Sequence, residues 1–145
     1  MAISPYVRQL REALGQTRLF LPSAAGLVRA DGNRLLLVQD RETLRWTTPG
    51  GVMELDETPA EAVVREVWEE AGLLVRPRAL FGVYGGPKFL VRYPNGDETV
   101  AVRYFTLDEA RQLPMSPWLI DVLPRLYEPA SVPWFESTAW RPPAG

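Results

Sequence analysis

The sequence predicts an α/β (α+β) fold in a single domain that spans residues 1–145. The chain has the length of one domain, and 46% of its residues are hydrophobic, which is enough to bury a proper core. Residues 59–71 carry apolar and acidic side chains on opposite faces of an amphipathic helix. Apolar runs before and after this segment are separated by hairpin turn signals, which indicates antiparallel strands.

The N-terminal part is predicted to hold one helix and two strands. A short helix is expected over residues 5–14, packed on the domain edge; a dimer contact or a lid is the alternative. Residues 18–30 predict a strand that is central in the sheet, because it is apolar on both faces. A turn at Asp31 and Gly32 then leads to a second, antiparallel strand over residues 34–40.

The next segment, from Trp46 to Gly51, leads into the central helix. We expect Trp46 to belong to the core rather than to stack on a ligand. Gly50 and Gly51 permit either a sharp bend or a close approach of the backbone to a phosphate.

The ends of the central helix are well signalled. Thr58 is a good N-cap, Pro59 suits the first helical position, and Glu61 follows the cap by three residues, which is a capping box. Gly72 is a C-terminal stop in the left-handed conformation. These signals predict a helix from Pro59 to Ala71.

One face of this helix is strongly acidic. Glu66, Glu69 and Glu70 fall on one arc, opposite an apolar arc centred on Val63 and Val67. Glu57, just before the cap, adds a carboxylate that can fold back towards them, whereas Arg65 is the one close cation in the sequence. Converging carboxylates favour a hard divalent cation such as Mg²⁺ or Mn²⁺. The alternative is a solvated charged face.

The C-terminal half is predicted to alternate strands with short helices. The expected elements are a strand over residues 73–84 interrupted near Pro77, a hairpin over 88–105, a helix over 107–113, and a helix from Pro117 that Pro124 kinks or ends. The tail, residues 128–145, is rich in proline yet aromatic, so we expect it to pack on its own domain or on a partner.

Composition excludes several classes of function. A net charge of −2 and a pI near 5.2 give no basic footprint for duplex nucleic acid. The chain has no cysteine and no histidine, which removes disulfides, thiolate nucleophiles, histidine-based zinc sites and imidazole catalysis. The first ten residues lack the apolar run of a signal peptide, and no stretch is long enough to span a membrane, so we expect a cytoplasmic protein without membrane contact.

The spacing of the acidic segment resembles a known family signature. Gly51, Glu57, Arg65-Glu66-Val67, Glu69-Glu70 and Gly72-Leu73 match the Nudix box, GX5EX7REUXEEXGU with U apolar, at every specified position. Seven such residues coincide by chance on the order of once in 10⁹ start positions. Asp56 stands where a glycine is common before the box glutamate. The resemblance implies a Nudix-type α/β/α sandwich with a mixed β-sheet and a catalytic loop-helix.

The resemblance also implies a function and roles for the residues of the box. It implies a Mg²⁺- or Mn²⁺-dependent hydrolase that cleaves a phosphoanhydride bond of a nucleoside diphosphate linked to another group. Four residues are implied as catalytic: Glu57, Arg65, Glu66 and Glu69. Glu66, Glu69 and Glu70 are implied metal ligands, with Glu57 as a further ligand or a partner of Arg65, which orients the carboxylates.

Three residues outside these roles complete the predicted site. Gly50 and Gly51 are expected to contact substrate. Glu98 is a candidate for an extra base or substrate contact, although an exposed turn residue is the alternative.

A nucleotide-binding sensor on a Nudix fold is the alternative function. An isomerase of the isopentenyl diphosphate type would require a cysteine, which the chain lacks.

The flanking segments resemble bacterial MutT-like and ADP-ribose-pyrophosphatase-like members of the family. Between Tyr93 and Tyr104, however, there is no room for two strands that we expect in that branch. Their loss would leave an exposed sheet edge beside the 88–105 hairpin, and an open edge invites pairing with another chain. We therefore expect a homodimer that covers this edge and the aromatic tail.

Overall fold

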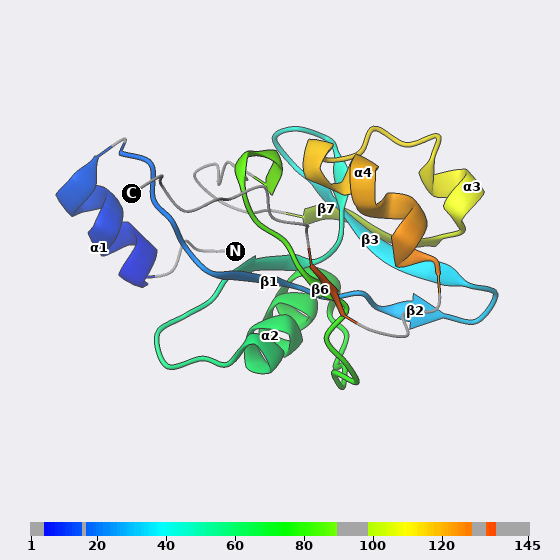
Figure 1. Ribbon diagram of the computed structural model, residues 1–145, viewed down its shortest axis with the longest axis horizontal. Coiled ribbons are helices and arrows are strands. Elements are labelled where there is room, and N and C mark those ends of the chain that lie inside the picture. Colours follow the sequence, from blue (N-terminus) through cyan, green and yellow to red (C-terminus); the bar gives the residue numbers. More distant parts are fainter. Residues whose placement is uncertain (1–4, 16, 90–98, 129–132, 136–145) are drawn as a thin grey trace, which may run out of the picture.

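The computed structural model describes residues 5–15, 17–89, 99–128 and 133–135. Its strands form a central layer, with α2 (Pro59–Ala71) on one side and with α3 (Leu107–Ala110) and α4 (Pro117–Leu126) on the other (Figure 1). Helix α1 (Pro5–Leu14) lies at one end of the molecule, where Val7 is its buried residue. This layering confirms the predicted α/β/α sandwich.

The larger antiparallel sheet is built around β3 (Arg34–Asp40). It pairs along its length with β7 (Thr99–Phe105) and, on its other side, with β2 (Arg29–Ala30) and β4 (Trp46–Thr47). Residues 35–38 are buried on both faces of β3, which is the pattern of a central strand. The central strand is therefore β3 rather than the one predicted over residues 18–30.

That predicted strand is divided between two sheets. Residues Ser23–Ala25 form β1, which pairs with β5 (Gly50–Val52), and the chain then crosses to β2 in the larger sheet. Gly26 lies at the crossing, where an added Cβ would lie 2.8 Å from Cγ2 of Val67 on α2. Close contact with the helix thus accompanies the break, and the prediction of one continuous strand was wrong.

The core on the α4 side joins β3, β7 and two helices. Trp46 packs edge-on against Phe105 with ring centroids 4.8 Å apart, which confirms its place in the core. The hydroxyl of Tyr127 donates to the carbonyl of Phe105 at 2.8 Å. Helix α4 continues past Pro124, because the apolar residues on either side of it are buried and their packing offsets the lost backbone bond.

The segment after α2 differs most from its prediction. Residues 73–81 form no helix or strand, and the expected strand is reduced to β6 (Gly82–Val83), which pairs in parallel with β8 (Trp134–Phe135). The parallel pair makes the strand arrangement mixed, as predicted, although the strands are divided among several sheets. It also shows that part of the tail pairs with its own chain. A 3₁₀ turn, Pro87–Phe89, stands where the next strand was expected to begin.

Two parts of the sequence prediction lie outside the described residues. Residues 90–98 include most of the first strand of the expected hairpin, its turn and Glu98, and residues 136–145 include Trp140. Within the described part of the chain, no helix has the length and apolar character needed to cross a membrane.

A buried hydroxyl between β4 and β5 gives a first testable prediction. Thr48 is 2% exposed, and its Oγ1 has no hydrogen-bond partner within the described residues. An unsatisfied buried polar group costs about 1–3 kcal/mol, so Thr48→Val should raise the melting temperature. Thr47→Val, at the neighbouring half-buried position, is the control and should change it little. A lower melting temperature for Thr48→Val would show that the hydroxyl is satisfied.

Candidate active site

Helix α2 is fixed at both ends by the local signals that predicted it. The amide of Thr58 donates to Oε2 of Glu61 at 2.8 Å, and the amide of Glu61 donates back to Oγ1 of Thr58 at 3.3 Å. Gly72 adopts the left-handed conformation with φ 67°, and its amide donates to the carbonyl of Trp68 at 2.9 Å. The capping box and the glycine stop are both confirmed, so the glutamates project from a defined helix.

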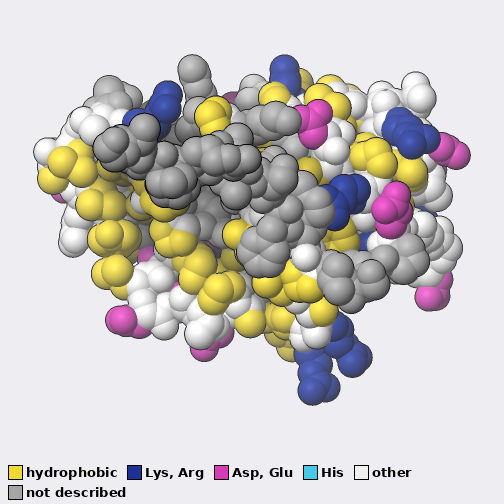
Figure 2. All heavy atoms as spheres, in the orientation of Figure 1, with side chains coloured by type: hydrophobic (Ala, Val, Ile, Leu, Met, Phe, Trp, Pro, Cys, Tyr) yellow, Lys and Arg dark blue, Asp and Glu magenta, His cyan; other side chains and the backbone are white. Residues whose placement is uncertain are grey.

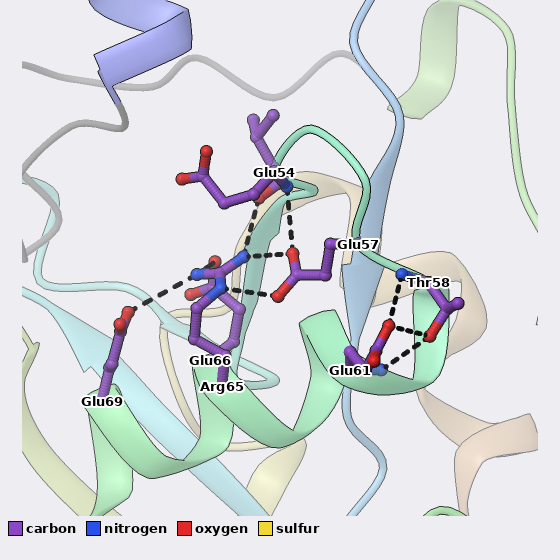
Figure 3. Close-up of polar contacts among 8 residues, drawn as sticks. Glu54, Glu57, Thr58, Glu61, Arg65, Glu66 and Glu69 are labelled. Carbon is purple, nitrogen blue, oxygen red and sulfur yellow. Dashed lines mark hydrogen bonds and ion pairs between the residues drawn. The ribbon is translucent and has the colours of Figure 1, made fainter.

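Arg65 gathers the carboxylates of the loop and the helix around one guanidinium (Figure 3). Its Nε and Nη2 donate to the two oxygens of Glu57, each at 2.9 Å. Its Nη1 lies 2.7 Å from Oε1 of Glu66 and 3.5 Å from Oε2 of Glu69. Its Nη2 also donates to the carbonyl of Val52 at 3.1 Å. The guanidinium therefore ties the loop before α2 to the acidic residues of the helix.

The two partners of this bidentate pair shift each other's protonation. The hydrogen bond from Arg65 lowers the pKa of Glu57, although partial burial opposes this effect. The hydrogen bond to Glu57 raises the pKa of Arg65, with a further contribution from Glu66. Both groups are thus charged at neutral pH, and the pair is stable as a charge-assisted bond.

Glu66 is buried, which contradicts its predicted place on an outer acidic face. It is 3% exposed, and α2 buries it together with Ala62 and Val67, so Val67 is buried as predicted whereas Val63 is only partly buried. Trp68 on the same helix is 57% exposed. The reason is that α2 packs against β5, where the glycine at position 51 leaves room for a carboxylate.

Gly51 provides that room, and Gly50 contacts a second glutamate. An added Cβ at Gly51 would lie 2.7 Å from the carboxyl carbon of Glu66, so a larger residue here would displace this carboxylate. The amide of Gly50 donates to Oε2 of Glu70 at 3.0 Å. The two glycines thus hold two glutamates of the box against the backbone. Contact of Gly50 and Gly51 with substrate stays a prediction.

Gly51→Ala should therefore disturb both the fold and the site. Overpacking of this kind costs about 1–3 kcal/mol, and displacement of Glu66 by about 1 Å should lower turnover by up to ~100-fold. The control is Gly85→Ala, because an added Cβ at Gly85 meets no atom within 4 Å. Thermal melts and turnover measured on both variants test this. Unchanged melting and turnover in Gly51→Ala would contradict the close packing of Glu66.

Backbone groups of the loop were missed at the sequence level. The amide of Glu54 donates to Oε2 of Glu57 at 2.9 Å, and the carbonyl of Val52 accepts from Arg65. Backbone donors leave no trace in side-chain patterns, so no signal could have found them. The sequence did give a signal at Asp56, which stands where a glycine is common. Its φ of 64° is left-handed, which explains why a glycine suits this position.

The donor set suits a hard divalent metal by its chemistry. Glu57, Glu66, Glu69 and Glu70 offer only oxygen atoms, and the space at Gly51 admits the carboxylate of Glu66 against the strand. Within the described residues, however, no three acidic side chains form a ready-made metal cluster, because Arg65 stands among them. Whether these residues bind metal stays a prediction, as does the role of Glu98, which lies outside the described residues.

Comparison with known proteins identifies relatives of this chain. The model of the NUDIX domain family matches residues 19–126. A MutT-like protein of Streptomyces ambofaciens is 46% identical over 79 residues, which cover 54% of this chain and 51% of the relative. An ADP-ribose pyrophosphatase of Methanocaldococcus jannaschii is 39% identical over 79 residues, covering 51% of this chain and 47% of the relative. The chain thus spans about half the length of these curated relatives.

A solved structure supports the fold independently. A NUDIX hydrolase from Nitrosomonas europaea superposes with a TM-score of 0.60 at 22% identity, covering 72% of this chain and 86% of the other. At this identity the likeness concerns the fold alone. It agrees with the sandwich of strands and helices described above.

Proposed function

Because the chain belongs to the NUDIX domain family, we propose that it is a divalent-metal-dependent pyrophosphohydrolase. It cleaves the phosphoanhydride bond of a nucleoside diphosphate linked to another group, and water adds across that bond to give a nucleoside monophosphate and a second phosphorylated fragment. The supporting observation is the gathering of three carboxylates, those of Glu57, Glu66 and Glu69, within 3.5 Å of one guanidinium. Relatives described as MutT-like and as ADP-ribose pyrophosphatase support a nucleotide-type substrate.

The proposed metal is Mg²⁺ or Mn²⁺, held by Glu66, Glu69 and Glu70 with Glu57 as a further ligand. When bound, such an ion supplies Lewis-acid polarisation of the phosphate groups and makes a water molecule more acidic. Glu70 is held in place by the amide of Gly50, and Glu66 by burial against Gly51. Glu69 is the most exposed of the three helix glutamates, which suits it to accept a proton from water at the surface of the site.

Arg65 acts as a positioning residue in this proposal. Its bidentate bond fixes Glu57, and its third nitrogen holds Glu66. These contacts engage all three guanidinium nitrogens, so Arg65 aligns the carboxylates and balances their mutual repulsion. We propose in addition that the chain forms a homodimer.

The test is a hydrolysis screen of the purified protein. The panel comprises dinucleoside polyphosphates, nucleotide sugars, ADP-ribose, NADH and modified deoxynucleoside triphosphates, each with Mg²⁺, with EDTA, and with Mg²⁺ restored after EDTA. We expect turnover of at least one compound that EDTA abolishes and Mg²⁺ restores. Tight binding of a nucleotide without turnover would instead support the sensor alternative. Turnover that is insensitive to EDTA would contradict the metal.

A further inference from the structure

An open groove of about 800 Å³ runs along α2 and the loop that precedes it. Its apolar lining comes from Leu55, Val64, Trp68 and Leu74. Three of these are unusually exposed for their type, with Leu55 at 64%, Trp68 at 57% and Leu74 at 81%. Exposed apolar side chains that gather in one place mark a surface that a partner covers, and an exposed tryptophan is a frequent anchor of such contacts.

The rim of this groove is acidic. Glu54, Asp56, Glu57 and Glu61 line it, and Arg65 is the one cation in the lining, so the groove carries a formal charge of −3. Its field repels phosphate groups and attracts a positively charged, partly apolar segment. Without a bound divalent cation, this charge favours a basic occupant of the groove over an anionic one.

A segment of matching character adjoins the groove on the same chain. This arm, residues 73–81, contains Arg76 and Arg78 and no acidic residue, and both arginines are exposed. It also exposes Leu74 and, at 58%, Leu80. Figure 2 shows Lys or Arg side chains projecting at the edge where Figure 1 places the chain between α2 and β6. The arm is basic and apolar, whereas the groove is acidic and apolar.

We propose that the groove binds the arm of a second copy of this chain, in a two-fold symmetric dimer. Leu74 both lines the groove and belongs to the arm, so the two surfaces adjoin, and a two-fold axis beside Leu74 allows both reciprocal contacts to form at once. The apolar side chains meet at the centre of each contact, and the arginines meet the carboxylates at its rim. The groove includes Glu57 and Arg65 of the proposed active site, but its test measures mass in solution and is independent of turnover.

The first measurement is the mass in solution. Light scattering coupled to size exclusion should give twice the chain mass of 16.3 kDa at high micromolar concentration. About 0.5 M salt should shift the equilibrium towards the monomer, because it screens the rim charges. A mass of 16.3 kDa at every concentration would overturn the proposal.

A charge exchange then tests the surface itself. The arm variant carries Arg76→Glu and Arg78→Glu, and the groove variant carries Glu54→Lys and Glu61→Lys. Each variant alone places like charges on arm and groove, so each should be monomeric. An equimolar mixture should dimerise, because the acidic arm of one chain then meets the basic groove of the other, while the reciprocal contact joins an unchanged basic arm to an unchanged acidic groove.

Recovery in the mixture also shows that neither variant is misfolded. A matched control, Arg41→Glu with Arg111→Glu, makes the same change of net charge at exposed positions elsewhere and should remain dimeric. Arm and groove variants that stay dimeric on their own would assign the dimer to another surface and overturn this one. Monomeric variants that do not recover on mixing would overturn the arm-to-groove pairing.

Discussion

Glu69→Gln should reduce hydrolysis at least ~100-fold, since loss of even an indirect partner of a metal ligand commonly costs about 10–100-fold. The side chain is 36% exposed and makes one long contact, 3.5 Å, to Arg65. Its replacement by an isosteric amide should leave the fold intact. With metal absent, the melting temperature should stay the same or rise, because one charge is removed from a group of neighbouring acids.

The matched control is Glu61→Gln on the same helix. Glu61 belongs to the capping box and not to the proposed ligand set, and glutamine at this position preserves the box. Turnover with Mg²⁺ and thermal melts on both variants separate a catalytic role from a structural one. Wild-type turnover in Glu69→Gln, or an unfolded protein, would contradict the assignment of Glu69.

The largest effect on stability is expected for Arg65→Ala. This change leaves Glu66, which is 3% exposed, without its ion pair, and it leaves Glu57 without its bidentate partner. Removal of one partner from a buried pair costs roughly 3–5 kcal/mol. Because 24% of the Arg65 side chain is exposed, we expect the lower end, about 3 kcal/mol. Turnover should fall as well, because the carboxylates lose their alignment.

Arg111→Ala is the control for this variant. Arg111 forms an exposed pair with Asp108 at 3.5 Å, and such surface pairs contribute about 0–1 kcal/mol. Denaturant unfolding and steady-state kinetics should show a loss of both stability and rate for Arg65→Ala alone. A purely kinetic loss with unchanged melting would instead indicate that Arg65 contacts substrate.

Local signals in the sequence predicted the scaffold of the site well. Thr58, Glu61 and Gly72 each act within a few residues of their own position, so the bounds of α2 followed from them. The turn at Asp31 and Gly32 predicted the β2–β3 hairpin for the same reason, because its backbone geometry depends on the turn residues themselves.

The errors arose where distant residues decide the outcome. A helical projection places Glu66 among outward acids, but its burial depends on the missing side chain of Gly51 and on the charge of Arg65. The break at Gly26 likewise depends on contact with Val67. Residues 73–81 were predicted as part of a strand because their apolar composition is typical of one, but local composition does not decide whether a strand finds a partner.

Direct titration with Mn²⁺, followed by the electron paramagnetic resonance signal of the free ion, tests the central claim most directly. Bound Mn²⁺ loses the sharp signal of the aqueous ion, so the method reports metal binding without substrate or turnover. The wild type and Glu61→Gln should bind the ion equally, and Glu69→Gln should bind it at least ~10-fold more weakly. Equal affinity in all three proteins, or no binding by the wild type, would contradict a metal site on the acidic residues of α2.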